Sequence, residues 1–276
     1  MKSNRNKGDI QLFTLQNLVQ PESIEEAYKI LIQRKTNTAL GGSGFLRMGS
    51  KRIGTAIELS NLNLNYIRED EKYIEIGAMT TFRDIETSDI INKYFNGVLA
   101  RSVYNIIGVQ FRNVVTVGAT VFSKYGFSDF ITALLSLDSE VELFGQGRMS
   151  LEEFLNKPYK KDLLTKIFIK KNNRKAIFKD FRNSVSDYSL INVAVSVNDN
   201  DWKIVVGARP RGAAIAKGAS ELLSKGSLTV EEIDRVATMV SEELAFGTNM
   251  RATEEYRKAL AESLVKTAVM EVLECK

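Results

Sequence analysis

The segment Thr38–Phe45 reads TALGGSGF, a short apolar run that ends in three glycines and a serine. A turn of this composition lets consecutive backbone N–H groups point into one cavity, because glycine carries no Cβ to obstruct them. The segment therefore predicts either a backbone cradle for a pyrophosphate or an ordinary tight turn. It is not a P-loop, because no Gly-Lys-Ser/Thr follows, and the third glycine of a dinucleotide-binding fingerprint is missing.

A second glycine-bearing segment, Gln110–Val121, reads QFRNVVTVGATV. We interpret Val114–Val121 as a strand whose small residues let either a ligand or a neighbouring helix approach the backbone. Nine residues after this segment's last threonine, Asp129 begins an apolar helix. Its carboxylate either caps that helix or, if the helix start lines a cavity, accepts hydrogen bonds from a sugar or ribityl hydroxyl.

The composition excludes several kinds of catalytic site. The 276 residues include no histidine and a single cysteine, Cys275. Ser-His-Asp and Cys-His nucleophile systems, His-ligated zinc or iron, thiolate metal cages and internal disulfides therefore cannot be built from this chain alone. We expect a bound cofactor or a partner chain to bring the reactive group, and we predict no catalytic residue and no metal site.

Charge and hydropathy argue against a nucleic-acid or membrane protein. The net charge is +4, from 38 Lys and Arg against 34 Asp and Glu, and the basic residues are spread along the chain. A nucleic-acid binder more often concentrates them in one stripe. No apolar run approaches the length of a membrane span, and the polar start at Met1–Gly8 does not read as a signal peptide. We therefore expect a cytoplasmic protein.

Local patterns predict a mixture of helices and strands. Capping signals begin helices at Ser23, Thr81, Ser150 and Thr229, and a last helix is expected over 253–272. Strands are expected at residues 55–59, 73–76, 140–143 and 164–169. Two apolar runs, 190–197 and 202–206, flank the turn sequence NDND and predict an antiparallel hairpin.

Taken in order, these segments resemble the FAD-binding (medium) subunits of the molybdenum hydroxylases, the family that contains carbon monoxide dehydrogenase and xanthine dehydrogenase. The resemblance runs from about Phe13 to Leu273. Its landmarks are LGGSG at 40–44, IGAMTT at 76–81, QFRN at 110–113 with TVGAT at 116–120, Asp129, DLLT at 162–165, FK at 178–179, DYSLINVA at 187–194 and RATEEYR at 251–257.

The resemblance implies an α+β fold. Residues 1–172 would form a FAD-binding domain of the PCMH (vanillyl-alcohol-oxidase-like) type, with two subdomains that divide near residue 60 and hold the cofactor between them. Residues 173–276 would form a smaller C-terminal domain of antiparallel strands and helices. The polar connector at 170–175 agrees with this division.

The resemblance also implies which residues contact FAD. Gly41–Gly44 would hold one part of the pyrophosphate, and a side chain introduced at Gly42 would take its place while leaving the fold largely intact. Lys179 would either stabilise negative charge on the reduced flavin or lie in solvent. The full predicted set is Ala39, Leu40, Gly41, Gly42, Ser43, Gly44, Phe45, Ile106, Thr116, Gly118, Ala119, Thr120, Asp129, Leu163 and Lys179.

The implied function is that of an oxidoreductase subunit in a heteromeric complex. A large subunit with the molybdenum cofactor would hydroxylate the substrate, and [2Fe–2S] clusters on a small subunit would pass electrons to FAD on this chain. An acceptor such as NAD would then take them. Molybdenum cofactor and clusters are expected on the partner chains only, and the substrate is left open.

Two departures from the family pattern keep two alternatives open. The second segment has Gly118-Ala119-Thr120 where the family reads Gly-Gly-Asn, and Lys124 and Tyr125 replace a small, proline-containing loop. The first departure favours a degenerate assembly module that has lost FAD. The second favours a free-standing FAD-dependent oxidoreductase, with Lys124 and Tyr125 as candidates for proton transfer.

Overall fold

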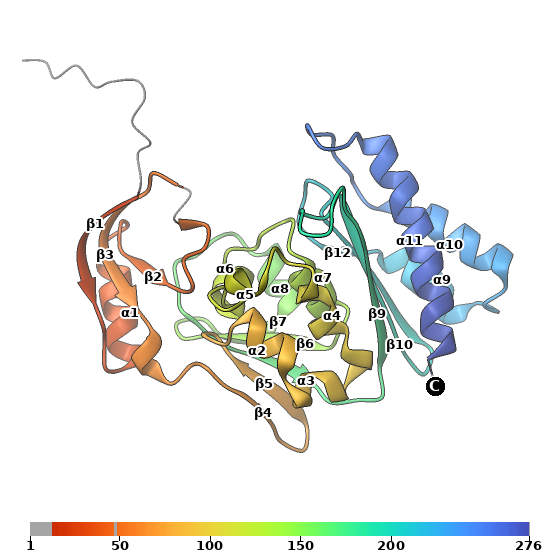
Figure 1. The fold of residues 1–276 in the computed structure, drawn as a ribbon. Coiled ribbons are helices and arrows are strands. Elements are labelled where there is room, and N and C mark those ends of the chain that lie inside the picture. Colours follow the sequence, from red (N-terminus) through yellow and green to blue (C-terminus); the bar gives the residue numbers. More distant parts are fainter. Residues whose placement is uncertain (1–12, 47–48, 276) are drawn as a thin grey trace, which may run out of the picture.

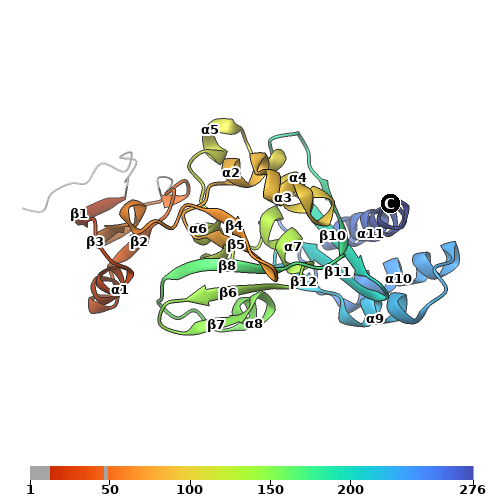
Figure 2. The same ribbon diagram turned by 90° about the horizontal axis from the view of Figure 1, so that it is seen from below.

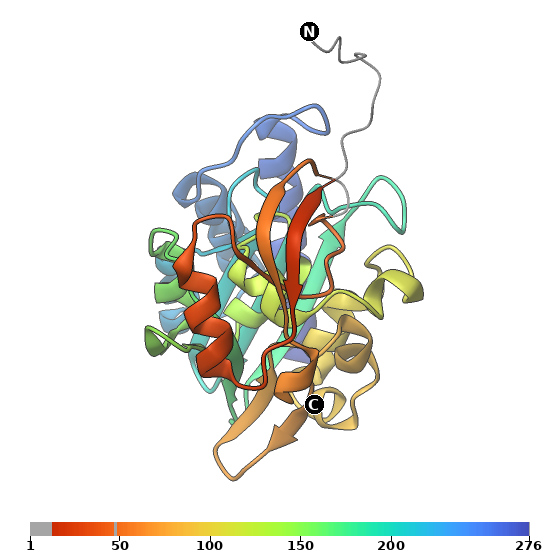
Figure 3. The same cartoon turned by 90° about the vertical axis from the view of Figure 1, so that its left-hand side faces the viewer.

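The computed structural model describes residues 13–46 and 49–275, and three β-sheets follow one another along the molecule (Figure 1). The first sheet is parallel, in the order β1-β3-β2, and α1 packs against it (Figure 3). Ser23 caps α1 as predicted, since its hydroxyl accepts a hydrogen bond from the N–H of Glu26. The elements are β1 (Thr14–Val19), α1 (Ile24–Gln33), β2 (Thr38–Leu40) and β3 (Arg52–Glu58).

The second sheet is antiparallel, in the order β4-β5-β8-β6-β7. Figure 2 shows α2 to α4 on one side of it. Apolar side chains of the sheet and the helices share one buried cluster. The elements are β4 (Ile67–Glu69), β5 (Tyr73–Gly77), α2 (Phe82–Thr87), α3 (Asp89–Lys93), α4 (Val98–Tyr104), α5 (Val109–Arg112), α6 (Val117–Phe122), α7 (Asp129–Leu135), β6 (Ser139–Leu143), β7 (Gly147–Ser150), α8 (Leu151–Asn156) and β8 (Leu164–Lys170).

The third sheet, β12-β11-β10-β9, lies between two sets of helices. Ala194 of β10 faces the cluster around α4 and α7, whereas its neighbour Val193 faces α9 to α11. The predicted hairpin is confirmed, with Asn198 opposite Asp201. The elements are β9 (Lys175–Phe181), β10 (Ile191–Asn198), β11 (Asp201–Gly207), β12 (Ala214–Ile215), α9 (Lys217–Lys225), α10 (Val230–Glu243) and α11 (Glu254–Glu274).

The strand predicted over Val114–Val121 is wrong, because most of this segment forms the helix α6. Thr116 caps it, accepting a hydrogen bond from the N–H of Ala119. One trace of strand pairing remains, an isolated antiparallel bridge between Thr116 and Thr81. The β-branched residues gave a strand pattern, but tertiary contacts decide the local structure here.

The helix predicted from Thr81 is interrupted at Ser88. The extended backbone of Ser88 ends α2, and its side chain accepts a hydrogen bond from the N–H of Ile91 to begin α3. The longest described helix, α11, has 21 residues. Within residues 13–46 and 49–275, no helix combines the length and the apolar character required to cross a membrane.

Candidate functional site

The two glycine-bearing segments meet in the structure. The first follows β2 and packs directly on the second, so that a Cβ added to Gly41 would lie 2.6 Å from the Cβ of Ala119. A Cβ added to Gly42 would lie 1.2 Å from the carbonyl oxygen of Val114. Glycine is therefore required at both positions by the protein itself. The expectation that a side chain at Gly42 would leave the fold largely intact is corrected, because the two segments would have to separate.

The first turn offers free backbone donors. Within the described part of the chain, no group accepts a hydrogen bond from the N–H of Gly42, Ser43 or Gly44. Ser43 has a left-handed backbone, with a φ of 58°, and its hydroxyl donates to the Gly41 carbonyl at 3.1 Å. Successive N–H groups in a turn with a left-handed residue form an anion-binding concavity. This arrangement fits a pyrophosphate.

The backbone of the second segment offers fewer N–H donors to a ligand than the first turn does. The N–H of Val117 donates to the Thr80 carbonyl and that of Gly118 to the Ala78 carbonyl, both at 2.9 Å. A Cβ on Gly118 would lie 2.6 Å from Ala78, so this glycine is required by packing. The start of α6 therefore faces the chain between β5 and α2. Side chains of the second segment, above all that of Thr120, remain to face a ligand.

Two adjoining cavities lie beside these segments. The cradle cavity, of about 330 Å³, is lined by residues 38–46 and by Thr116, Ala119 and Thr120 among others. The aromatic cavity is much smaller, at about 50 Å³, and is lined by Ile106, Phe111, Tyr125, Phe127, Asp129, Arg182 and Tyr188 among others. Phe45, Val115, Thr120 and Tyr125 line both. A ligand with its polar end in the cradle cavity and its apolar end in the aromatic cavity would pass these four residues.

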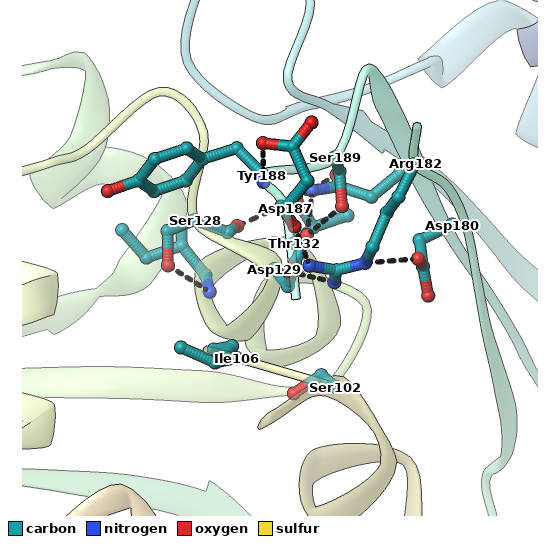
Figure 4. A network of polar contacts seen from close by, with 12 residues as sticks. Ser102, Ile106, Ser128, Asp129, Thr132, Asp180, Arg182, Asp187, Tyr188 and Ser189 are labelled. Atoms are coloured by element: carbon teal, nitrogen blue, oxygen red, sulfur yellow. Dashed lines mark hydrogen bonds and ion pairs between the residues drawn. The ribbon is translucent and has the colours of Figure 1, made fainter. Parts of the chain in front are cut away.

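Asp129 lies at the polar end of the aromatic cavity, at the start of α7 (Figure 4). Its interpretation as the helix cap is wrong, because the Ser128 side chain accepts the capping hydrogen bond from the N–H of Ile131. One carboxylate oxygen of Asp129 accepts hydrogen bonds from Ser189 at 2.7 Å and from Asn192 at 2.5 Å. The other pairs with Arg182.

The Asp129–Arg182 pair joins α7 to the C-terminal sheet. Burial raises the pKa of Asp129, and the guanidinium opposes this shift only in part. Burial lowers the pKa of Arg182, but Asp129 and Asp180 outweigh it, so the net shift is upward. Arg182 also donates to the Asp187 carbonyl at 2.6 Å. The wall of the aromatic cavity is therefore built from both parts of the chain.

The structure brings most of the predicted residues to these two cavities. Residues at the cradle cavity are Ala39, Leu40, Gly41, Gly42, Ser43, Gly44, Phe45, Thr116, Ala119 and Thr120, and the aromatic cavity adds Ile106 and Asp129. Gly118 lies behind them, against Ala78.

Leu163 and Lys179 lie outside both cavities. Leu163 is buried in the small cluster beneath α1. In β9, Phe178 faces the central cluster, so its neighbour Lys179 points to the other side of the sheet. There the ammonium of Lys179 pairs with Glu271 of α11.

The sequence pattern named Tyr125 only as a candidate for proton transfer and missed the rest of the aromatic wall and Arg182. Tyr125 and Phe127 stack with ring centroids 5.1 Å apart and interplanar angle 19°. Their signal was present as two aromatic residues around Gly126, just before a helix cap, whereas nothing in the sequence marked Arg182. Lys124, considered for proton transfer, instead donates to the carbonyl groups of Phe154 and Lys157 at the end of α8.

Known proteins resemble this chain along nearly its whole length. The family model described as the FAD binding domain in molybdopterin dehydrogenase matches residues 12–171, and that of the CO dehydrogenase flavoprotein C-terminal domain matches residues 176–272. The nicotine 6-hydroxylase medium subunit of Paenarthrobacter nicotinovorans is 24% identical, over 91% of this chain and 95% of that protein. The glyceraldehyde dehydrogenase medium chain of Sulfolobus acidocaldarius is 24% identical, over 92% of this chain and 97% of that protein.

A solved structure has the same fold. The carbon monoxide dehydrogenase of Hydrogenophaga pseudoflava superimposes with a TM-score of 0.87 at 19% identity, covering 95% of this chain and 99% of the matched chain. The family models together span both parts of the chain, and the glycine turn and adjoining cavities described above lie within the first of them. The chain therefore belongs to the family of FAD-binding medium subunits of the molybdenum hydroxylases.

Proposed function

We propose that this chain is the electron-transfer subunit of a molybdenum hydroxylase complex. Its FAD would receive electrons from [2Fe–2S] clusters on a small partner subunit and release them to an acceptor such as NAD. A large partner subunit would carry the molybdenum cofactor and the substrate. The N–H groups of Gly42, Ser43 and Gly44, which bond to no described residue and lie beside an apolar cavity, are the observation that carries this proposal.

Different residues would contact different parts of FAD. The turn after β2 would hold the pyrophosphate through its backbone N–H groups, and Thr116 and Thr120 would flank it from the second segment. The aromatic cavity would take the isoalloxazine, with Ile106 and Asp129 in its wall. FAD supplies the redox chemistry when bound, whereas the chain binds it, orients it and excludes water. No side chain is required as a general acid or base.

The proposed division of the chain follows from the same site. Residues 1–172 would form the FAD-binding domain, and residues 173–276 a C-terminal domain that completes the wall of the aromatic cavity through Arg182 and Tyr188. The relatives are named medium subunit and medium chain of a hydroxylase and a dehydrogenase. These names support assembly with a larger and a smaller partner, and we propose that the complex works in the cytoplasm.

The first experiment is a titration of the purified chain with FAD. Flavin absorbance that survives desalting at about one FAD per chain is expected. A chain that stays colourless with excess FAD, without any gain in thermal stability, would favour the degenerate assembly module. Co-purification with a molybdenum-containing large subunit and an iron–sulfur small subunit is then expected. Substrate turnover by the flavin-loaded chain alone would favour a free-standing oxidoreductase.

A further inference from the structure

The loop between α6 and α7 is fixed at two points that flank Tyr125. On one side, Lys124 has a left-handed backbone with a φ of 51°. Its ammonium donates to the Phe154 carbonyl at 2.5 Å and the Lys157 carbonyl at 2.7 Å. These are carbonyl groups at the end of α8, where a cation is favoured by the helix dipole. The residue before Tyr125 is therefore tied to the central sheet region.

On the other side, Gly126 is tied to the C-terminal domain. Its carbonyl accepts a hydrogen bond from the N–H of Ala208 at 3.0 Å. A Cβ at this position would lie 3.0 Å from the carbonyl oxygen of Arg211, so the two backbones touch. Tyr125 thus sits between two anchors and its Cα has little freedom to move.

The ring of Tyr125 stands at the boundary between the two cavities. It stacks on Phe127 and contacts Phe45, with a centroid distance of 4.9 Å to the latter. Tyr125 lines both the cradle cavity and the aromatic cavity. No residue in the described ranges hydrogen-bonds to its hydroxyl group. A phenol held in place by its ring, with its hydroxyl unused by the residues that the structure describes, is suited to donate to a ligand.

We infer that Tyr125 is a FAD-binding residue whose hydroxyl donates a hydrogen bond to the ribityl chain. The inference rests on the proposed function. FAD bound as proposed, with its pyrophosphate in the cradle cavity and its isoalloxazine at the aromatic cavity, would have its ribityl chain at their boundary. Four residues line that boundary, and Tyr125 and Thr120 are the two that carry hydroxyl groups. The phenol reaches further from the backbone than the threonine hydroxyl does.

The test is Tyr125→Phe in the full chain, with the dissociation constant for FAD measured by the change in flavin fluorescence. Loss of one neutral hydrogen bond is expected to weaken FAD binding by about 2- to 10-fold. The thermal midpoint of the chain without FAD should stay unchanged, because the hydroxyl bonds to no described residue. Tyr159→Phe is the matched control, since that tyrosine is 70% exposed and lies outside both cavities.

ADP separates the ribityl chain from the phosphates, because ADP lacks the ribityl group. Tyr125→Phe should bind ADP as tightly as the unmodified chain does. Equal FAD affinity in the two proteins would overturn the inference, and so would an equal loss of ADP affinity. Failure of the unmodified chain to bind FAD would instead refute the proposed function, so the two failures are distinguishable.

Discussion

Replacing Arg182 with methionine should destabilise the protein strongly. The guanidinium pairs with Asp129, and the two side chains are only 6% and 5% exposed. Removing the cation leaves a buried carboxylate with hydrogen bonds from Ser189 and Asn192 but no opposite charge beside it. Breaking one side of a buried ion pair costs about 3–5 kcal/mol. At about 2 °C per kcal/mol for a chain of this size, the thermal midpoint should fall by at least about 6 °C.

The loss of stability caused by Arg182→Met should grow as the pH rises. Burial raises the folded-state pKa of Asp129 above the usual value for an aspartate, and without Arg182 that pKa should rise further. The folded variant then keeps a proton that the unfolded chain releases above about pH 4. Stability therefore falls as the pH rises from about 4 through the folded-state pKa. The gap in thermal midpoint between the variant and the unmodified chain should be widest near pH 8 and narrower near pH 5.

Thermal unfolding followed by circular dichroism at pH 5, 6, 7 and 8 measures this gap. The matched control is Arg211→Met, since Arg211 is exposed and its loss should cost less than about 0.5 kcal/mol. A double-mutant cycle with Asp129→Asn isolates the pair from the second contact of Arg182, with Asp180. A shift below 2 °C, a gap that does not change with pH, or no coupling in the cycle would refute the reasoning.

Three further predictions test other parts of the structure. Gly42→Val should abolish FAD binding and lower the thermal midpoint, because its Cβ would meet protein backbone, whereas Gly212→Ala, with no atom within 4 Å of the added Cβ, should do neither. Lys179→Met should leave the dissociation constant for FAD unchanged, and a tenfold loss would place this side chain at the flavin after all. Glu69 accepts hydrogen bonds from Lys171 and Tyr94, which lower its pKa to about 2. Its stabilising contribution is complete above about pH 4.5 and is lost as the pH falls through about 2, so the midpoints of Glu69→Gln and the unmodified chain should differ at pH 6 and converge near pH 2.

Sequence patterns predicted the elements whose causes are local. Ser23, Ser150 and Thr229 each cap a helix through a side-chain oxygen, and the turn at Asn198–Asp201 joins two paired strands. These features need only neighbouring residues. The segment around Gly118 could not be predicted in the same way, because its helix is held by carbonyl groups of distant residues.

The candidate site was predictable where the proposed ligand contacts come from the backbone. The resemblance located the glycine turn because its glycines leave a sequence signature, whereas side-chain direction had to come from the fold. Lys179 illustrates this, since β9 lies between two layers and adjacent residues face opposite sides. Asp129 illustrates it too, because its partner Arg182 is 53 residues away in the sequence.

If FAD occupies the proposed site, the position of Asp129 links its binding to the contact between the two parts of the chain. Its carboxylate lines the aromatic cavity and is held by Arg182, Ser189 and Asn192, all beyond residue 172. A ligand that occupies this cavity binds only when both parts are docked, so it must stabilise their contact. Saturation at 100 times the dissociation constant adds about 2.7 kcal/mol to the stability of the bound state. That gain approaches the lower end of the loss expected for Arg182→Met, so excess FAD should recover part of that variant's thermal midpoint if the variant still binds it.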